Sequence, residues 1–195
     1  PVELYTDGSS LNNPGPSGLG FIIRYWDDND GKDVPIAKEI EGKQGFRLST
    51  NSRMEISAGI YGINEIMKKI ADKTLEGATI ISVASDSSYF CDAINKHWID
   101  KWQQNNWLKF NQAPVKNKDL WEQVIDIINK LKGMGIALTI THVDGHSGHE
   151  FNERADKLAV SASNDSANHI VDTEYEKSNQ NKRTNFGSNT YKQYR

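Results

Sequence analysis

The sequence has little cysteine, no long hydrophobic run and no excess of basic residues, and each of these absences excludes a class of protein. The single Cys91 cannot close an intramolecular disulfide, which excludes a small disulfide-stabilised secreted domain. Apolar runs such as Ile80–Ala84 are far too short to span a bilayer, and Pro1–Ser10 lacks the basic-then-apolar pattern of a signal sequence. We therefore expect a cytoplasmic protein that does not contact a membrane.

Composition and charge are those of an ordinary globular domain. Hydrophobic residues make up 36% of the 195 residues and charged residues 25%, which excludes a disordered chain and provides for one core. The 23 Lys and Arg against 26 Asp and Glu give a formal net charge of −3, so the basic excess common in nucleic-acid binders is lacking. No internal repeat is visible. We expect a monomer without an obligate protein partner.

Hydrophobic periodicity predicts three strands followed by alternating helices and strands. Strands are expected at Val2–Thr6, Leu19–Trp26, Ile36–Glu41, Thr79–Ala84 and Ile136–Val143. Helices are expected at Arg53–Ile70, Asp86–Asn95, Trp98–Asn106, Lys118–Leu131 and Asn152–Ser163. This order predicts an α/β domain, over residues 1–165, in which helices flank a mixed sheet.

The end of the chain differs from the rest. From Ile170 onward it is rich in Asn, Lys, Gln, Ser and Thr and shows no apolar period. We therefore expect residues 166–195 to form a mobile, disordered polar tail instead of a second core.

Four acidic residues stand where a simple core needs no charge. Asp7 closes the first strand, and Glu55 lies at the start of the long helix. Asp86 follows the fourth strand, and Asp156 lies inside the last helix. Because strand ends and adjoining helix starts converge in mixed α/β sheets, we expect these carboxylates to lie together. Crowded carboxylates without cysteine ligands favour Mg²⁺ or Mn²⁺, and two such ions can act on the attacking water and the leaving oxygen of a phosphodiester.

Each acid also has a purely structural explanation. Asp7-Gly8 is a common turn dipeptide, and Glu55 fits a helix capping box. Asp86 could cap the following helix, and Asp156 could be a solvated residue paired with a neighbouring cation. Taken singly, these residues do not distinguish a metal site from ordinary turns and caps.

Four stretches, taken together and in this order, resemble the motifs of type 1 ribonuclease H. They are Tyr5-Thr6-Asp7-Gly8-Ser9 with Asn13-Pro14-Gly15-Pro16, Thr50-Asn51-Ser52-Arg53-Met54-Glu55, Ser85-Asp86-Ser87-Ser88-Tyr89, and Val143-Asp144-Gly145-His146-Ser147-Gly148-His149 continuing into Asn152-Glu153-Arg154-Ala155-Asp156. The resemblance runs from about Val2 to Ala162. It implies the ribonuclease H-like fold, a five-stranded mixed sheet with helices on both faces.

The resemblance also implies an activity and a site. The family cleaves the RNA strand of RNA–DNA hybrids without sequence specificity, leaving 3′-hydroxyl and 5′-phosphate ends. Two Mg²⁺ ions, for which Mn²⁺ can substitute, would be held by Asp7, Glu55, Asp86 and Asp156. His146 matches the family's catalytic histidine, which assists proton transfer or product release.

Substrate contacts are implied in the same way. Small polar groups would read the 2′-hydroxyls of a wide minor groove, and Thr50 resembles a residue of a pocket for a DNA phosphate. The residues expected to contact the hybrid at these places are Gly8, Ser9, Asn13, Thr50, Asn51 and Ser52.

A second substrate-binding element is implied by the aromatic residues that follow the third motif. The family has a protruding basic handle there, whereas aromatics at helical spacing are equally typical of a packed core. The predicted handle carries Trp98, Trp102, Trp107 and Lys116. The chain departs from the family at residues 103–106, where Gln and Asn replace several Lys or Arg, and at Asp144, which adds negative charge near the metals. Fewer phosphate contacts predict weaker binding and a shallower salt dependence.

Alternatives to this interpretation stay open. His142, His146 and His149 could indicate zinc, although Gly145 and Gly148 favour a loop over a ligating helix. The chain could be a free-standing enzyme or the nuclease domain of a reverse transcriptase or mobile element, because the family's N-terminal hybrid-binding module does not precede the first strand. A hybrid-binding protein that has lost catalysis is a further hypothesis.

Overall fold

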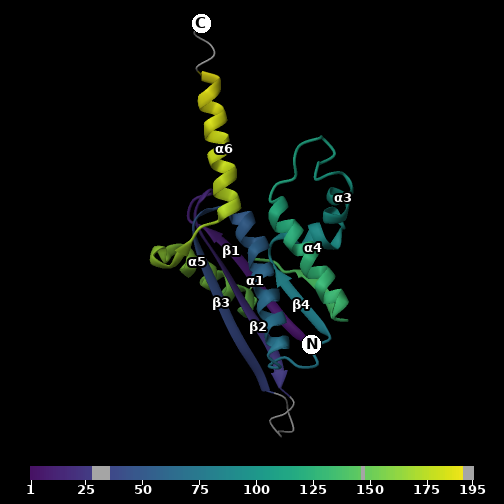
Figure 1. Ribbon diagram of the computed structural model, residues 1–195. Helices are drawn as coiled ribbons and strands as arrows, with labels where there is room; N and C mark the ends of the chain where they lie inside the picture. Colours follow the sequence, from purple (N-terminus) through teal and green to yellow (C-terminus); the bar gives the residue numbers. More distant parts are fainter. Residues whose placement is uncertain (28–35, 146–147, 191–195) are drawn as a thin grey trace.

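A mixed six-stranded sheet forms the centre of the protein (Figure 1). The computed structural model describes residues 1–27, 36–145 and 148–190, with side chains described as far as Asn181. The strands are β1 (Val2–Ser10), β2 (Gly15–Asp27), β3 (Ile36–Ser49), β4 (Ile80–Ser85), β5 (Ala137–His142) and β6 (His169–Ile170). Their order in the sheet is β5-β4-β1-β2-β3-β6. The pairs β1–β2 and β2–β3 are antiparallel, whereas β1–β4, β4–β5 and β3–β6 are parallel.

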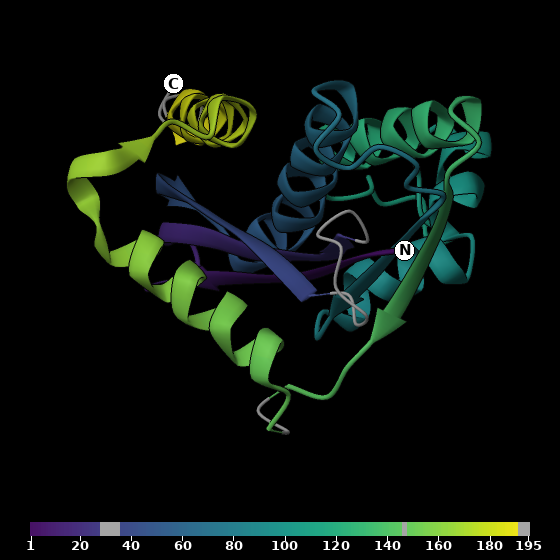
Figure 2. The same cartoon turned by 90° about the horizontal axis from the view of Figure 1, so that it is seen from below.

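Helices cover both faces of this sheet. They are α1 (Asn51–Ala71), α2 (Ser88–Asn95), α3 (Trp98–Gln104), α4 (Lys118–Gly133), α5 (Glu150–Asn164) and α6 (Thr173–Thr190). Figure 2 shows α1 and α4 on one side of the strands and α5 on the other. Within the described ranges, no helix is both long and apolar enough to cross a membrane. The predicted α/β fold, with a mixed sheet between two helical layers, is confirmed.

The hydrophobic core lies between the sheet and the layer formed by α1 and α4. Leu4 on β1 and Ile60 on α1 are buried there, and Trp121 on α4 is fully enclosed. Helix α1 begins where the Thr50 hydroxyl accepts a hydrogen bond from the backbone N–H of Arg53, at 3.4 Å. The expected capping box is therefore absent at this helix start, because Thr50 performs the capping.

Strand β1 continues beyond its predicted end. Asp7 and Gly8 pair with Gly20 and Leu19 of β2, and the strand ends only at Ser10. The predicted turn at Asp7-Gly8-Ser9 is therefore wrong, because pairing across the sheet overrides the local preference of an Asp-Gly dipeptide for turns. As a result, Asp7 is held by a central strand instead of a loop.

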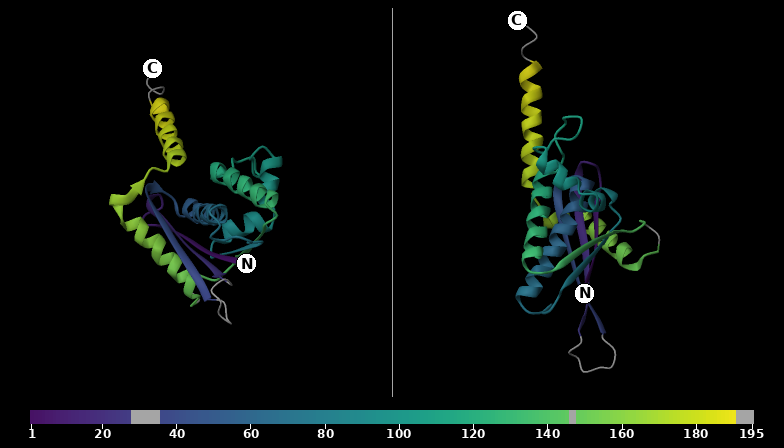
Figure 3. Two further views of the ribbon diagram at one scale, coloured as in Figure 1. Left: turned by 60° about the horizontal axis from the view of Figure 1, so that its bottom comes forward. Right: turned by 90° about the vertical axis from the view of Figure 1, so that its right-hand side faces the viewer.

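The segment after α5 differs from the mobile tail that its composition predicts. A short 3₁₀ helix (Ser166–Asn168) leads into β6, which pairs with Gly45 and Phe46 of β3 and accounts for the sixth strand. Asp172 follows and is buried. Helix α6 then extends away from the sheet, as Figure 3 shows from two further directions.

Candidate active site

Two of the four predicted carboxylates lie at the ends of neighbouring strands: Asp7 is on β1, and Asp86 directly follows β4. The parallel register pairs Thr6 of β1 with Ser85 of β4, which places Asp7 beside Asp86 at the ends of the two paired segments. Asp7 is only 7% exposed, although nothing in the core requires a charge there. The backbone N–H of Gly8 donates a hydrogen bond to Asp7 Oδ1 at 2.7 Å. A buried acid is therefore held rigidly next to a second acid.

Asp7 is repelled by each of the other three predicted carboxylates. Burial and repulsion by Asp86 raise the pKa of Asp7 from 3.8 to about 8, against the lowering effect of the Gly8 hydrogen bond. The carboxylates of Asp156 and Glu55 raise the pKa of Asp7 further. These three acids come from the end of β4, α5 and α1, so each lies near enough to Asp7 to influence its ionisation.

Glu55 is oriented by two hydrogen bonds. The side-chain amide of Asn51 donates to Oε1 at 2.7 Å, and the Ser87 hydroxyl donates to Oε2 at 2.5 Å. Burial raises the pKa of Glu55, the Ser87 hydrogen bond opposes this shift, and Asp86 adds to it. Asn51 is thereby fixed beside the acid cluster.

The structural explanation offered for Asp86 does not hold, and one of the cations beside Asp156 is engaged elsewhere. Ser87, not Asp86, caps α2, because its hydroxyl accepts a hydrogen bond from the backbone N–H of Phe90 at 3.2 Å. Arg154, a neighbour of Asp156, is engaged by Glu39 and Glu41 of β3. The usual structural role of a cap is therefore filled by Ser87 instead of Asp86.

The loop before α5 approaches the same acids. A Cβ atom on Gly145 would lie 2.9 Å from Asp86 Oδ2, so the backbone there contacts the carboxylate directly. His142 Nε2 lies 3.1 Å from the backbone oxygen of Asp86 and donates to it, because a carbonyl oxygen only accepts. His146 lies outside the described residues, and its catalytic role stays a prediction. The ring of His149 packs beside that of Tyr5 in a tilted arrangement, with 5.2 Å between the ring centroids.

The donor set fits a hard divalent cation chemically. All four acids offer oxygen, and a cation would relieve the repulsion that raises the pKa of Asp7. In the part of the chain that is described, however, no three His, Cys, Asp or Glu side chains are grouped closely enough to hold a metal as they stand.

Predicted substrate-binding residues surround the start of α1. The backbone N–H of Asn51 donates to Asn13 Oδ1 at 3.2 Å, which joins the loop after β1 to this helix. Gly8 and Ser9 are half-buried on β1, and Asn13 is exposed. Asn13 and Gly8 therefore lie next to the start of α1, on which Glu55 is placed.

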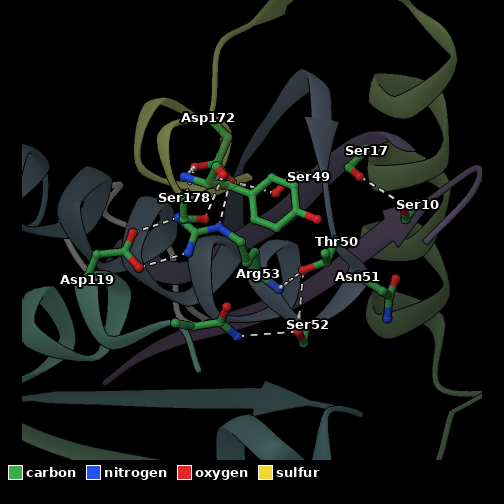
Figure 4. Close-up of polar contacts among 12 residues, drawn as sticks. Ser10, Ser17, Ser49, Thr50, Asn51, Ser52, Arg53, Asp119, Asp172 and Ser178 are labelled. Carbon is green, nitrogen blue, oxygen red and sulfur yellow. Dashed lines mark hydrogen bonds and ion pairs between the residues drawn. The ribbon is translucent and has the colours of Figure 1, made fainter. Parts of the chain in front are cut away.

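Thr50 and Ser52 meet a residue that the sequence analysis did not select. The Asn117 side-chain amide donates to Ser52 Oγ at 3.4 Å, and Ser52 Oγ lies 3.5 Å from Thr50 Oγ1 (Figure 4). Asn117 has φ of 60° and stands directly before α4. Thr50, Ser52 and Asn117 thus form one polar cluster between the starts of α1 and α4. The sequence signal for Asn117 was its position directly before a helix.

The predicted handle is formed by α3 and the chain that leads to α4. Trp98 and Trp102 are half-buried, and their rings lie 6.1 Å apart; Trp102 packs on the buried Trp121 at 5.8 Å. Lys116 is exposed, and Lys118 Nζ lies 5.7 Å from the ring centre of Trp107. The tryptophans therefore combine a packed side with a partly exposed one. Phe110, which the sequence analysis did not select, is 103% exposed in this loop.

The fold and the site define an α/β domain with an acidic cluster at the ends of its central strands. The sequence matches the family described as RNase H over residues 1–164. It is 38% identical over 164 residues to the ribonuclease H of Caldanaerobacter subterraneus subsp. tengcongensis, covering 82% of this chain and 88% of that protein. It is 39% identical over 161 residues to the ribonuclease H of Aeromonas salmonicida, covering 83% of this chain and 88% of that protein. The chain belongs to the ribonuclease H family.

A solved structure supports the same assignment. The chain is similar to LC9-RNase H1, described as a type 1 RNase H with the type 2 active-site motif. The TM-score is 0.65 at 27% identity, over 90% of this chain and 79% of that chain.

Proposed function

We propose that this protein is an endoribonuclease that hydrolyses the RNA strand of RNA–DNA hybrids with two Mg²⁺ ions, leaving 3′-hydroxyl and 5′-phosphate ends. The observation that carries the proposal is the burial of Asp7, only 7% exposed, beside Asp86 at the ends of two neighbouring strands, where repulsion from Asp86, Asp156 and Glu55 helps to raise the pKa of Asp7 to about 8. Membership of the ribonuclease H family supplies the substrate class.

The acid cluster would hold the metal ions. Asp7, Glu55, Asp86 and Asp156 would be their ligands, and Mn²⁺ would substitute for Mg²⁺. When bound, the ions supply an activated water and a stabilised leaving oxygen for phosphodiester hydrolysis. An all-oxygen set argues against zinc, and so does Cys91, because burial raises the pKa of its thiol to about 12.

The groups around the start of α1 would orient the RNA strand. Asn51 contacts both Glu55 and Asn13, and it is therefore placed to hold a 2′-hydroxyl close to the acids. A ribose hydroxyl donates and accepts hydrogen bonds, and DNA lacks this group, so such contacts select RNA without reading bases.

The DNA strand would be held at two places. Thr50, Ser52 and Asn117 offer small polar donors for one backbone phosphate between the starts of α1 and α4. The handle would add a second contact through Trp98, Trp102, Trp107 and Lys116. Because these contacts involve backbone and shape, the proposed cleavage is independent of sequence.

Cleavage of a labelled RNA–DNA hybrid tests the proposal directly. The parent protein should cut the RNA strand only when Mg²⁺ or Mn²⁺ is added, and it should leave single-stranded RNA and duplex DNA intact. Product ends are read from mobility and from ligation. A protein that binds the hybrid without cutting it would support the hypothesis of lost catalysis.

An Asp86→Asn variant tests the site. It should lose almost all cleavage while keeping the circular dichroism spectrum of the parent. Asp92→Asn is the matched control, because Asp92 lies six residues further on, on α2, and pairs with Lys96 at 2.7 Å. Equal loss in both variants, or full activity of Asp86→Asn, would contradict the site assignment.

A further inference from the structure

The C-terminal segment is attached to the domain by more than the two-residue strand β6. The Gln44 side-chain amide donates to the backbone oxygen of Asn168 at 3.2 Å, and His169 Nε2 donates to the backbone oxygen of Ala162 at 3.0 Å. These contacts fix the direction in which the chain leaves the sheet. As a result, Asp172, which is only 8% exposed, lies beside the start of α1.

Arg53 is the partner that receives Asp172. Its guanidinium donates to both oxygens of Asp172, at 2.7 and 2.9 Å, and to both oxygens of Asp119, at 2.8 and 2.6 Å (Figure 4). Ser49 adds a hydrogen bond to Asp172 at 2.6 Å. Arg53 is 4% exposed, so its ion pair with Asp172 is enclosed and little screened by water, whereas the Asp119 side chain is 28% exposed.

This network has almost no capacity left to bind a ligand. A guanidinium has five N–H groups, and four hydrogen bonds of Arg53 already go to the two carboxylates. Two carboxylates against one guanidinium also leave the group with a net negative charge, which does not attract phosphate. Arg53 and Asp172 are therefore suited to holding other residues in place.

The residues held in place are those of the polar cluster formed by Thr50, Ser52 and Asn117. The backbone N–H of Arg53 donates to Thr50 Oγ1, and Arg53 directly follows Ser52. On the other side of the network, Asp119 stands two residues after Asn117. The ion network therefore joins the starts of α1 and α4. The separation of these two helix starts sets the spacing of the side chains in the polar cluster.

We propose that Asp172 is a positioning residue for nucleic-acid binding: acting through Arg53, it sets the spacing between Thr50 and Ser52 on α1 and Asn117 before α4. The proposal rests on the proposed function, because it takes the polar cluster as the binding site for a backbone phosphate of the hybrid. In this arrangement a segment more than 100 residues away in sequence completes the substrate site without contacting the substrate.

Asp172→Asn isolates this role. Asp172 also caps α6, accepting a hydrogen bond from the backbone N–H of Tyr175 at 3.3 Å, and Asn caps helices as well as Asp does. The substitution therefore removes the negative charge that pairs with Arg53 and keeps the hydrogen bond that caps α6. Hybrid binding is measured in EDTA with a short RNA–DNA duplex, and cleavage in Mg²⁺ gives kcat and KM.

The variant should raise the dissociation constant roughly two- to tenfold, the range for one hydrogen-bonded group, and raise KM more than it lowers kcat. The slope of log K against log salt should stay near that of the parent, because Thr50, Ser52 and Asn117 carry no charge that neutralises a phosphate. A residue with a purely structural role would lower stability and leave KM and the dissociation constant unchanged.

Glu176→Gln is the matched control. Glu176 lies on the same segment and pairs with Arg47 at 2.7 Å, but Arg47 is 60% exposed and has no contact with Arg53. This control should keep the parent's KM and dissociation constant. If Asp172→Asn fails to fold, Ser49→Ala, which removes only the hydrogen bond to Asp172, should shift both quantities in the same direction by less.

The outcomes separate the two proposals. A parent protein that does not cleave hybrid contradicts the proposed function. A parent that cleaves, with Asp172→Asn or Ser49→Ala variants that keep its KM and dissociation constant, overturns the positioning role of Asp172 alone.

Discussion

Gly8 and Glu55 are in backbone contact: a Cβ atom built on Gly8 would lie 2.4 Å from the amide nitrogen of Glu55. Strand β1 and helix α1 can approach this closely only because residue 8 has no side chain. The contact also brings Asp7, one residue earlier, close to the carboxylate of Glu55. The separation of two proposed metal ligands therefore depends on a glycine that carries no functional group.

Replacing Gly8 by Ala should separate the strand from the helix. The clash is with backbone atoms of residues 54 and 55, which cannot rotate away, so we expect a loss of about 1–3 kcal/mol in the free energy of unfolding. Displacing Glu55 by even 1 Å should reduce kcat by about a hundredfold. Urea denaturation and hybrid cleavage measure the two effects.

The control for this substitution is Gly133→Ala at the end of α4. A Cβ atom there would have no neighbour within 4 Å, and Ala favours the helix, so stability should stay the same or rise by up to about 1 kcal/mol. Activity of the control should equal that of the parent. A Gly8→Ala variant that behaves like this control would show that the close contact is unimportant.

Stability of the metal-free protein should fall as the pH rises. Asp7 has a pKa of about 8 in the folded state and 3.8 as its ordinary value, so between these limits the folded state holds a proton that the unfolded state has released. The contribution of Asp7 to the free energy of unfolding is then fully present below pH 4 and is lost as the pH rises to about 8. The buried Glu55, whose pKa is also raised, acts in the same direction.

An Asp7→Asn variant should remove most of this decline. In EDTA at pH 8 it should be more stable than the parent, by an amount of the order of 2 kcal/mol, and at pH 4 the difference should vanish. Urea denaturation at several pH values measures it, with Asp92→Asn expected to follow the parent. A parent whose stability is the same at pH 5 and pH 8 would contradict the buried, repelled Asp7.

The order of helices and strands was predictable, because apolar residues repeat along them. Helix α1 was placed within two residues at each end, and the sheet and its helical layers followed from the order of elements. Strands β1, β2 and β3 extend beyond their predicted ends, β3 as far as Ser49, because pairing with the neighbouring strand continues where the apolar pattern stops. The proximity of Asp7 and Asp86 was predictable from the motifs around them, although each acid alone was ambiguous. In both cases the signal lay within a few neighbouring residues.

The parts that were missed depend on pairing between distant segments. Asp7 was predicted in a turn because its neighbours favour turns, but β2 provides a partner strand. Strand β6 has two residues, too few to show a period, and Asp172 meets Arg53 across 119 positions of sequence. Asn117 contacts Ser52 in the polar cluster only because α4 packs beside α1.

Two lysines on the handle should strengthen hybrid binding. Gln103 and Gln104 are exposed at the end of α3, where the family commonly carries basic residues. The double substitution Gln103→Lys, Gln104→Lys should lower the dissociation constant and steepen its dependence on salt by up to about two phosphate contacts. Binding in EDTA at several salt concentrations measures both quantities.

A lysine on the opposite face of the sheet is the control for charge alone. Asn164→Lys adds a positive charge at the exposed end of α5, away from the handle (Figure 2). It should leave the salt slope near that of the parent. If the handle variant and the parent give the same titration, Gln103 and Gln104 do not face phosphates.

Phe110 should contribute to hybrid binding through its exposed ring. The backbone N–H of Lys109 donates to the oxygen of Ala113 at 2.8 Å, and that of Gln112 donates to the oxygen of Lys109 at 2.9 Å, so a tight turn presents the ring to solvent. Exposed aromatic rings beside lysines bind nucleic acids by stacking, which predicts a roughly fivefold or greater rise in dissociation constant for Phe110→Ala. Phe110→Trp should retain tight binding, whereas Met134→Ala, which removes a 48% exposed side chain at the far end of α4, should have no effect. Equal affinity of Phe110→Ala and the parent would place this ring outside the nucleic-acid interface.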